Sequence, residues 1–250
     1  MSSGEHGHPM DEYEEVRTIY NEIAELYHKK RLTPEDSTWN DLLEVPAMEA
    51  MLRPLVQGKR VLDLGCGTGL LTRTINDWGG HVRGIDISEE MIRLAREQNP
   101  KLEFVVGRSD NLPFDDGEFD IVASSLVMHY LKDLLPTFKE VSRILVSGGR
   151  FIFSMHHPFS GFYSKGKSAE NSTGTPDPYF HNESYYWRMC GRDILSFHHT
   201  FEDIIRSLKE SGFSVRDMVE CRPEAGLQGS FDDFQFTSKY PTFCVFDTSR

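Results

Sequence analysis

A glycine-rich loop between a short apolar strand and a helix is the feature that most constrains how this chain can fold. The apolar run RVLDL at 60–64 leads into GCGTG at 65–69, and the helical segment LLTRTINDW follows at 70–78. Glycines at such a junction let a ligand approach the backbone closely, and loop amides and a helix N-terminus can offer unpaired N–H groups. The junction therefore predicts a ligand site at the end of the first strand of a sheet.

The alternation of strand and helix continues along the chain. Such alternation is typical of right-handed strand–helix–strand units, which build an α/β fold around a parallel sheet. Further strands are expected at 81–86, 102–107, 119–125, 148–155, 213–220 and 242–248, and further helices at 11–30, 39–56, 88–98, 131–146 and 201–212.

Two acidic residues flank the glycine loop. Asp63 lies just before it, and Asp86 ends the second predicted strand. A carboxylate at the second position is placed to accept hydrogen bonds from ribose hydroxyls. Dinucleotide-binding loops have the spacing G-x-G-x-x-G, whereas GCGTGL has leucine where the third glycine would be. The pattern indicates a nucleoside-binding, Rossmann-like half and opposes a dehydrogenase.

Four motifs over residues 60–155 now carry a family resemblance. VLDLGCGTGLL (61–71) resembles the first motif of class I S-adenosylmethionine-dependent methyltransferases, and GIDIS (84–88) resembles their acidic second motif. GRSDNLPFDDGEFDIV (107–122) is similar to the region that contacts adenine, and ILVSGGRFIF (144–153) to the step after it. The chain looks most like the small-molecule group that includes the ubiquinone and menaquinone biosynthesis methyltransferases. This resemblance implies a Rossmann-like, seven-stranded, mostly parallel sheet with an antiparallel last strand and helices on both faces.

The resemblance implies S-adenosyl-L-methionine as the cofactor, S-adenosyl-L-homocysteine as its product, and a set of contacts grouped by part of the cofactor. These are Asp63, Gly65, Cys66, Gly67 and Gly69 for the methionine end; Asp86 for the ribose; Ile87, Met91, Asp110, Asn111 and Leu112 for the adenine; Ser124 and Ser125 toward the sulfonium; and Tyr20 and Tyr27 for a helical lid. Structural alternatives stand beside them, since Asp110 suits a turn and the two tyrosines suit a packed helix face.

Residues 156–199 interrupt the alternation and are rich in aromatic and histidine side chains. They hold five of the ten histidines, and no long periodic stretch is evident there. We expect an aromatic-walled pocket with a few polar groups. Methyl transfer needs alignment, and a nucleophile that carries a proton also needs a base. His157 is the first candidate, followed by His156 and His129. Expected substrate contacts are Tyr163, Tyr179, Tyr185, Trp187 and His199.

The alternatives for this segment are structural. A histidine pair before proline can simply end a strand, and aromatic residues can form a small core under a cap. No histidine spacing typical of metal sites is present, so no metal is expected. Together with the rest of the chain, the segment suggests four parts: a tail and helical lid (1–58), a cofactor-binding core (59–155), an inserted substrate cap (156–199) and the C-terminal part of the core sheet (200–250).

Charge and cysteine usage restrict the partners. The chain has 27 Lys and Arg against 39 Asp and Glu, a net charge of −12, which disfavours nucleic acid and anionic membranes. The four scattered cysteines and the lack of a signal segment favour the cytoplasm. We expect a small-molecule substrate, no nucleic-acid or membrane partner, and a monomer or homodimer.

These observations predict methyl transfer from S-adenosylmethionine to a small aromatic or heterocyclic molecule by in-line displacement. The nucleophile is open among oxygen, nitrogen, carbon and sulfur. Alternatives are an RNA or protein methyltransferase on the same fold, and a protein that binds S-adenosylmethionine without catalysis.

Overall fold

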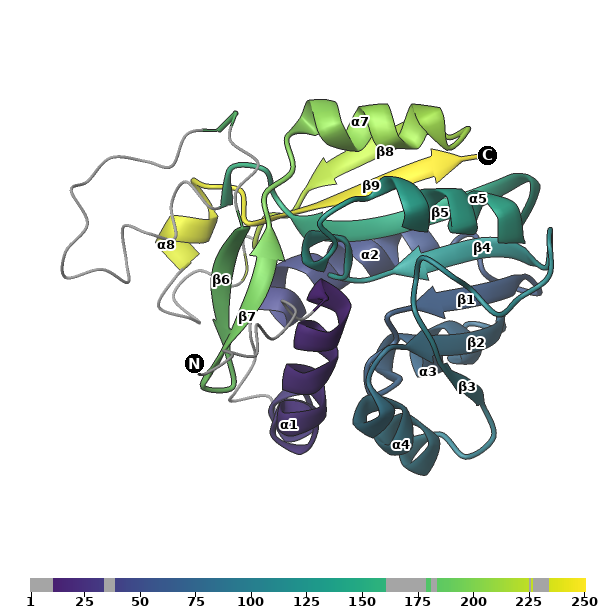
Figure 1. Ribbon diagram of the computed structural model, residues 1–250, viewed down its shortest axis with the longest axis horizontal. Coiled ribbons are helices and arrows are strands. Elements are labelled where there is room, and N and C mark those ends of the chain that lie inside the picture. Colours follow the sequence, from purple (N-terminus) through teal and green to yellow (C-terminus); the bar gives the residue numbers. More distant parts are fainter. Residues whose placement is uncertain (1–10, 34–38, 161–178, 181–183, 225, 227–233) are drawn as a thin grey trace, which may run out of the picture.

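The computed structural model describes residues 11–33, 39–160, 179–180, 184–224, 226 and 234–250. A seven-stranded sheet has the order β3-β2-β1-β4-β5-β9-β8 (Figure 1). Its first five strands pair in parallel, and β9 is antiparallel to both of its neighbours, which confirms the predicted sheet. The strands are β1 (Arg60–Leu64), β2 (His81–Asp86), β3 (Glu103–Val106), β4 (Phe119–Ser124), β5 (Leu145–His156), β8 (Ser214–Glu220) and β9 (Phe243–Ser249).

Apolar layers cover both faces of the sheet. Successive side chains of a strand point to opposite faces, so the continuous apolar run of β1 requires helices on each side. Leu62 and Leu64 pack in the layer that contains residues of α5 (Leu135–Ile144) and α7 (Phe201–Glu210). Val61 packs in the opposite layer with residues of α2 (Val45–Leu52) and α3 (Leu70–Asp77). The α/β sandwich thus follows from the sequence pattern.

The N-terminal segment lies at the carboxyl ends of the central strands. Helix α1 (Glu12–Leu32) begins after Asp11, whose side chain accepts from the Tyr13 amide. It lies beside the carboxyl ends of β1, β2 and β4, and it contacts α4 (Glu89–Gln98) (Figure 1). A short π-helix, η2 (Asn40–Glu44), then leads directly into α2. This arrangement places α1 over the sheet edge where the predicted ligand site lies.

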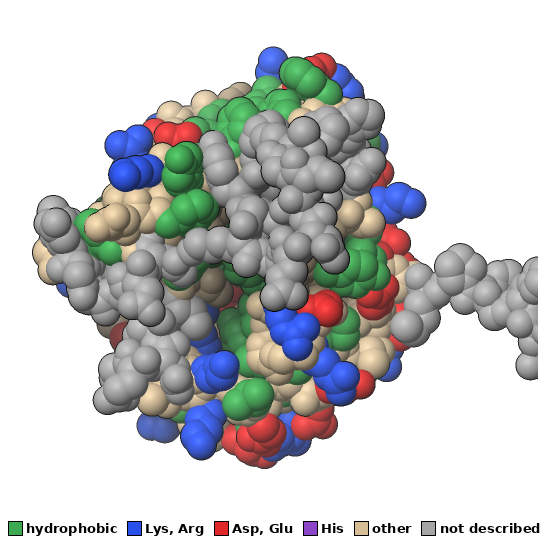
Figure 2. Space-filling model, turned by 90° about the vertical axis from the view of Figure 1, so that its left-hand side faces the viewer, with side chains coloured by type: hydrophobic (Ala, Val, Ile, Leu, Met, Phe, Trp, Pro, Cys, Tyr) green, Lys and Arg blue, Asp and Glu red, His purple; other side chains and the backbone are tan. Residues whose placement is uncertain are grey.

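Charges of both signs are mixed on the surface. On the face shown in Figure 2, Lys and Arg side chains lie between Asp and Glu side chains, and the coloured residues there form no large basic patch. None of the helices that the structure describes is both long enough and apolar enough to cross a membrane.

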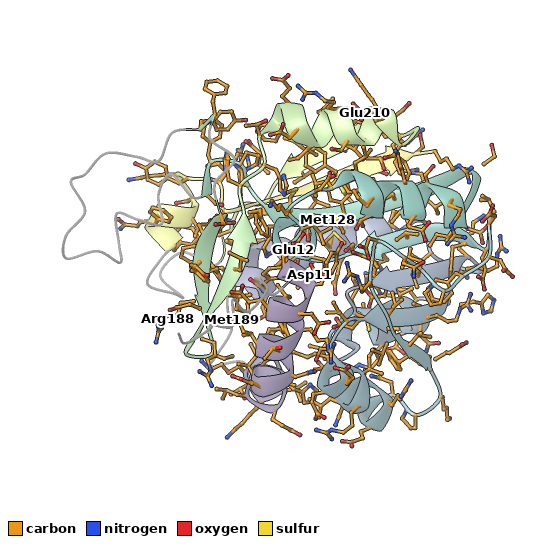
Figure 3. All side chains as sticks on the ribbon, viewed as in Figure 1. Asp11, Glu12, Met128, Arg188, Met189 and Glu210 are labelled. Atoms are coloured by element: carbon orange, nitrogen blue, oxygen red, sulfur yellow. The ribbon has the colours of Figure 1, made fainter. Side chains whose placement is uncertain are left out.

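A β-hairpin lies within the segment expected to lack periodic structure, which corrects that part of the sequence analysis. Strands β6 (Ser184–Met189) and β7 (Arg192–Phe197) pair antiparallel around a two-residue turn. The turn residues Cys190 and Gly191 have φ angles of 50° and 80°. The hairpin contacts α1, and Figure 3 marks its turn end at Arg188 and Met189. A shorter helix, α8 (Phe234–Thr237), lies between β8 and β9, where the sequence analysis predicted no element.

Candidate active site

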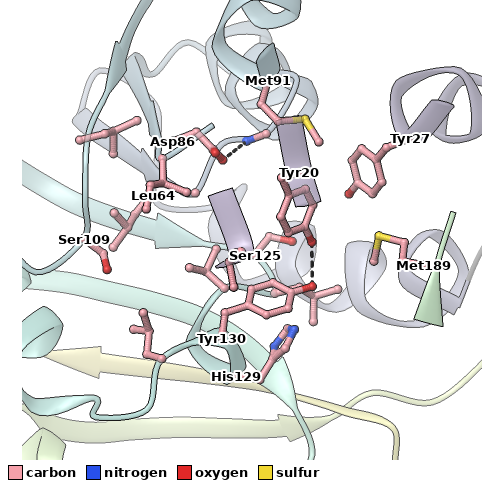
Figure 4. Close-up of a pocket in the computed structure, with 18 of the residues that line it drawn as sticks. Tyr20, Tyr27, Leu64, Asp86, Met91, Ser109, Ser125, His129, Tyr130 and Met189 are labelled. Atoms are coloured by element: carbon pink, nitrogen blue, oxygen red, sulfur yellow. Dashed lines mark hydrogen bonds between the residues drawn. The ribbon is translucent and has the colours of Figure 1, made fainter. Parts of the chain in front are cut away.

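A cavity opens at the carboxyl ends of β1 to β5, between the sheet, α1 and the hairpin (Figure 4). It has an empty volume of about 1010 Å³, including space open to solvent. Ligands of open α/β sheets bind at this edge, so the cavity is the candidate site. The loops or ends of five strands contribute to its wall: Gly65 and Gly67 after β1, Asp86 and Ile87 at β2, Gly107 and Ser109 after β3, Ser125, Leu126 and Val127 after β4, and His156 at the end of β5.

The glycine loop presents bare backbone to this cavity. Gly67 has a φ angle of 52°, and nothing lies within 4 Å of the position that a Cβ would occupy. The loop amides, however, are already bonded within the protein. Gly65 and Cys66 donate to the Ile85 carbonyl at 2.7 and 3.0 Å, and Gly67 donates to the Asp86 carboxylate at 2.8 Å. These three N–H groups are therefore not the free donors that the sequence predicted.

Two predicted cofactor residues of the loop do not line the cavity. The Cys66 side chain is buried in an apolar cluster with Ile92, Ala95 and Phe104. Gly69 precedes α3 with a φ angle of 79°, and a Cβ there would lie 2.9 Å from the Phe104 ring. Both residues pack on the side of the loop that faces Phe104 and support the shape of the loop there.

The two acidic residues are placed differently. Asp86 lines the cavity and accepts from the backbone amides of Gly67 at 2.8 Å and Ser88 at 2.9 Å. Asp63 lies beneath the loop, 1% exposed, and accepts from the Thr72 hydroxyl at 2.6 Å. Burial raises the pKa of both carboxyl groups, and that of Asp63 reaches about 7. The structure thus brings Asp86, but not Asp63, to the cavity wall.

The residues predicted to contact adenine after β3 lie outside the cavity wall. Asp110 is held by the Arg108 guanidinium, with N–O distances of 3.0 and 2.8 Å, and this ion pair lowers the pKa of its carboxyl group. Asn111 is exposed and Leu112 is buried in the core, and none of these three predicted residues lines the cavity. Ser109, one residue earlier, does.

The loop after β4 is held in a strained conformation. Leu126 has a φ angle of 55°, which costs a non-glycine residue roughly 1–3 kcal/mol. Its amide donates to the Ser154 hydroxyl at 2.9 Å, and Ser154 in turn donates to the buried Glu44 carboxylate. Ser125 lines the cavity and donates to the same Glu44 oxygen at 2.8 Å. Ser124, also predicted, is buried and donates to a backbone carbonyl of β1.

Aromatic residues of α1 form part of the cavity wall. Tyr20 and Tyr27, the two tyrosines predicted to contact the cofactor, both line it. The hydroxyl oxygens of Tyr20 and Tyr130 lie 2.7 Å apart, as Figure 4 shows. Tyr130 belongs to the short helix η3 (Met128–Tyr130), and sequence reasoning gave it no role.

A stacked histidine pair lies beside this lid. The rings of His129 and His156 have centroids 3.7 Å apart and planes within 7° of each other. Both residues line the cavity. Neither ring nitrogen of His129 has a hydrogen-bond partner among the described residues, whereas Nδ1 of His156 lies 2.7 Å from the Tyr185 hydroxyl. Burial lowers the pKa of both rings, that of His156 to about 3, so the pair is uncharged near neutral pH.

His157, the first candidate base, does not line the cavity. Its Nδ1 accepts from the Phe159 amide at 3.1 Å, so Nε2 carries the ring proton and faces the Glu220 carboxylate at 3.2 Å. Consecutive residues of an extended segment point to opposite sides, and His156 is the one directed to the cavity. Of the three candidate histidines, His129 and His156 are therefore the two that line the cavity.

Only some of the residues predicted to contact the substrate lie at the cavity. Trp187 lines the cavity, and Tyr185 reaches its wall through His156. The Tyr179 hydroxyl accepts from the first amide of α7, and His199 donates to a backbone carbonyl near η3. Neither of these two lines the cavity, and Tyr163 lies outside the described residues.

Several lining residues had no role in the sequence analysis. Tyr13 belongs to the first turn of α1 and Arg31 to its last turn, Asn40 begins η2, and Met189 ends β6. Arg31 is part of the basic run KKR, which is common in the last turn of a helix because it complements the helix dipole. No local pattern distinguishes it from its neighbours.

Comparisons with known proteins agree with this architecture. A family model described as "Methyltransferase domain" matches residues 62–153. A Haemophilus influenzae protein is 29% identical over 213 residues, which are 78% of this chain and 82% of that protein. The demethylmenaquinone methyltransferase of Lactococcus lactis is 32% identical over 161 residues, which are 61% of this chain and 63% of that enzyme. The crystal structure of an S-adenosylmethionine-dependent methyltransferase from Mesorhizobium loti is 28% identical, with a TM-score of 0.72, and covers 86% of this chain and 100% of that one.

The family match covers the part of the chain that holds the glycine loop and Asp86. The match to the Lactococcus lactis enzyme spans less than two thirds of its length. The five residues expected to contact a substrate lie outside the family match.

Proposed function

Because the chain carries a class I S-adenosylmethionine-dependent methyltransferase domain, we propose that it transfers a methyl group to a small aromatic or heterocyclic molecule. The observation that carries this proposal is a single cavity with two chemically different halves. The half at β1 to β3 contains Gly67, Asp86 and Ser109. The half at β5 and the hairpin contains the stacked histidines and Trp187.

The residues at the first half fit the cofactor. The open space beside Gly67 admits a ligand against bare backbone, and the Asp86 carboxylate suits ribose hydroxyls. Ile87 and Met91 supply an apolar surface for the adenine ring. When bound, S-adenosylmethionine supplies a methyl group already activated as a sulfonium. The protein has then mainly to align the acceptor and to exclude water.

The second half fits an aromatic acceptor. Its wall is formed by Tyr27, Tyr130, Trp187 and Met189, and small-molecule pockets are commonly lined in this way. The imidazoles there are uncharged and can accept hydrogen bonds. Since α1 and the hairpin enclose this half, they would hold an acceptor in one orientation, which is the main contribution that an in-line displacement requires.

His129 and His156 are the proposed catalytic residues. Both nitrogens of His129 lack partners among the described residues, so this ring can accept a hydrogen bond from a hydroxyl or N–H group of the acceptor. His156 is held by the Tyr185 hydroxyl and stacks on the His129 ring. A hydrogen bond to His129 would orient the nucleophile of the acceptor.

A cytoplasmic location and a small-molecule partner are part of the proposal. The cysteines Cys66, Cys190, Cys221 and Cys244 are all free thiols, which suits a reducing compartment. The net charge of −12 supports a partner other than nucleic acid.

A methyl-transfer assay tests the function directly. The protein is incubated with S-adenosylmethionine labelled on the methyl group and a panel of hydroxylated and nitrogen-containing aromatic molecules. We expect label in at least one of them, and about tenfold or greater loss of that activity in Trp187→Ala. Tyr186→Ala, a change at an exposed residue of the same strand, is the matched control and should keep the activity.

Two results would contradict the proposal. Label that entered only tRNA or protein would favour the alternative class of acceptor. Binding of S-adenosylmethionine without transfer to any acceptor, tRNA and protein included, would favour a non-catalytic binding protein.

A further inference from the structure

Arg31 is the single lysine or arginine among the described residues that line the cavity. Its side chain is 14% exposed, and its two terminal nitrogens lie 3.3 Å from the Tyr27 hydroxyl and 3.0 Å from the Asp41 carboxylate. Its Nε is buried and has no hydrogen-bond partner among the described residues. A buried N–H of a charged group is costly to leave unpaired, so this atom indicates a missing acceptor.

The η2 segment, which lies next to Arg31, is held to the loop after β4 by a partly buried hydrogen bond. Asn40 lines the cavity at the start of η2, and Glu44 ends the same short helix in a fully buried position. One Glu44 oxygen accepts from Ser125, which itself lines the cavity. The η2 segment is therefore tied to the loop after β4, and Glu44 acts as a positioning residue for the segment that carries Asn40 and Asp41.

The cofactor has a group that needs such a donor. S-adenosylmethionine ends in an α-amino acid whose carboxylate requires hydrogen-bond donors or a positive charge. The amides of Gly65, Cys66 and Gly67 are already bonded within the protein. Asp86 is the single Asp or Glu among the described lining residues, and its charge has the wrong sign. Arg31 is the lining side chain with the complementary charge and an unpaired donor.

We propose that Arg31 binds the carboxylate at the amino-acid end of the cofactor, with Asn40 as a neighbouring polar contact. This inference rests on the proposed function. It places a charged contact to the cofactor on α1, so that the lid helix and the glycine loop hold the same ligand from opposite sides. An arginine is suited to this task because its guanidinium binds a carboxylate through a planar set of donors.

Titration calorimetry with matched ligands tests the assignment. S-adenosylhomocysteine carries the amino-acid arm, whereas 5′-methylthioadenosine has the same nucleoside and sulfur without it. Loss of one charge-assisted hydrogen bond predicts that Arg31→Gln binds S-adenosylhomocysteine about 10- to 100-fold more weakly. Affinity for 5′-methylthioadenosine should change less than about threefold. Arg31→Lys should recover part of the loss, because it keeps the charge but not the planar donors.

Arg17→Gln is the matched control, since Arg17 lies on the same helix and pairs with Glu14 and Glu89 outside the cavity. It should leave both affinities unchanged, and circular dichroism checks that each variant is folded. Equal weakening of both ligands by Arg31→Gln, or unchanged affinity for S-adenosylhomocysteine, would overturn the assignment alone. Wild-type protein that bound neither ligand would overturn the proposed function as well.

Discussion

Burial shifts the pKa values of single residues at the cavity wall and beneath it. The pKa values of His129 and His156 are lowered by burial, and that of Asp63 beneath the loop is raised to about 7. Among the described lining residues, Arg31 is the single Lys or Arg and Asp86 is the single Asp or Glu.

The pKa of His156 predicts a pH-dependent stability. Its ring titrates near 6.5 when unfolded and at about 3 when folded, so between these values the unfolded state binds the additional proton. The free energy of unfolding should then fall by about 1.4 kcal/mol for each pH unit as pH drops through this window. His156→Gln keeps a partner for Tyr185 but removes this contribution. Urea unfolding at several pH values should show a shallower acid dependence for the variant, and identical slopes would contradict the burial of a neutral ring.

Single residues of the site could be predicted where a local sequence motif fixes their position, and not where a contact with another part of the chain decides it. Asp86 and Gly67 lie in a motif whose chemistry is local, so their position at the cavity follows from the sequence. His156 and His157 are adjacent, and only the direction of the strand end separates them. Asp110 matched its motif, but the guanidinium of Arg108 occupies its carboxylate. A sequence pattern does not show such a competing partner.

Among the elements that line the cavity, the β6–β7 hairpin is one that the sequence analysis did not predict. Its turn is formed by Cys190 and Gly191, both with positive φ, and turns of this kind are usually recognised by Asn-Gly or Asp-Gly. Strand β6 also alternates between exposed and half-buried residues, which weakens its apolar signal. The hairpin nevertheless brings Trp187 and Met189 to the cavity and packs Ile194 against α1.

The contact between the hairpin and α1 can be tested by one substitution. Ile194 is fully buried in a cluster with Val16 and Ile23 of α1 and with Tyr130. Ile194→Ala removes buried methyl groups and should lower the free energy of unfolding by about 2–4 kcal/mol. Tyr186→Ala on the exposed side of β6 should change it by no more than about 0.5 kcal/mol. Equal effects of the two substitutions in urea unfolding would contradict the packing of the hairpin on α1.

For the whole molecule, the sheet could be predicted and the assembly of the cavity could not. The core strands are continuous apolar runs, and each is followed by a helix or a turn signal, so their order along the chain implies a parallel sheet. The pattern of the N-terminal segment gives two amphipathic helices, and only the family resemblance suggested that they form a lid. Arg31 and Asn40 line the same cavity as Gly67 only because α1 and η2 pass over the sheet edge. Such long-range contacts follow from the packing of separate elements.

Binding of S-adenosylmethionine is the measurement that tests the central claim most directly. Calorimetric titration of the wild-type chain should show saturable binding, and Asp86→Ala should weaken it roughly 10- to 100-fold because a buried acceptor for the ribose is lost. Glu210→Ala, at an exposed acidic residue at the end of α7, should bind like the wild type (Figure 3). A folded wild-type protein that gave no binding signal would contradict the assignment of this cavity to the cofactor.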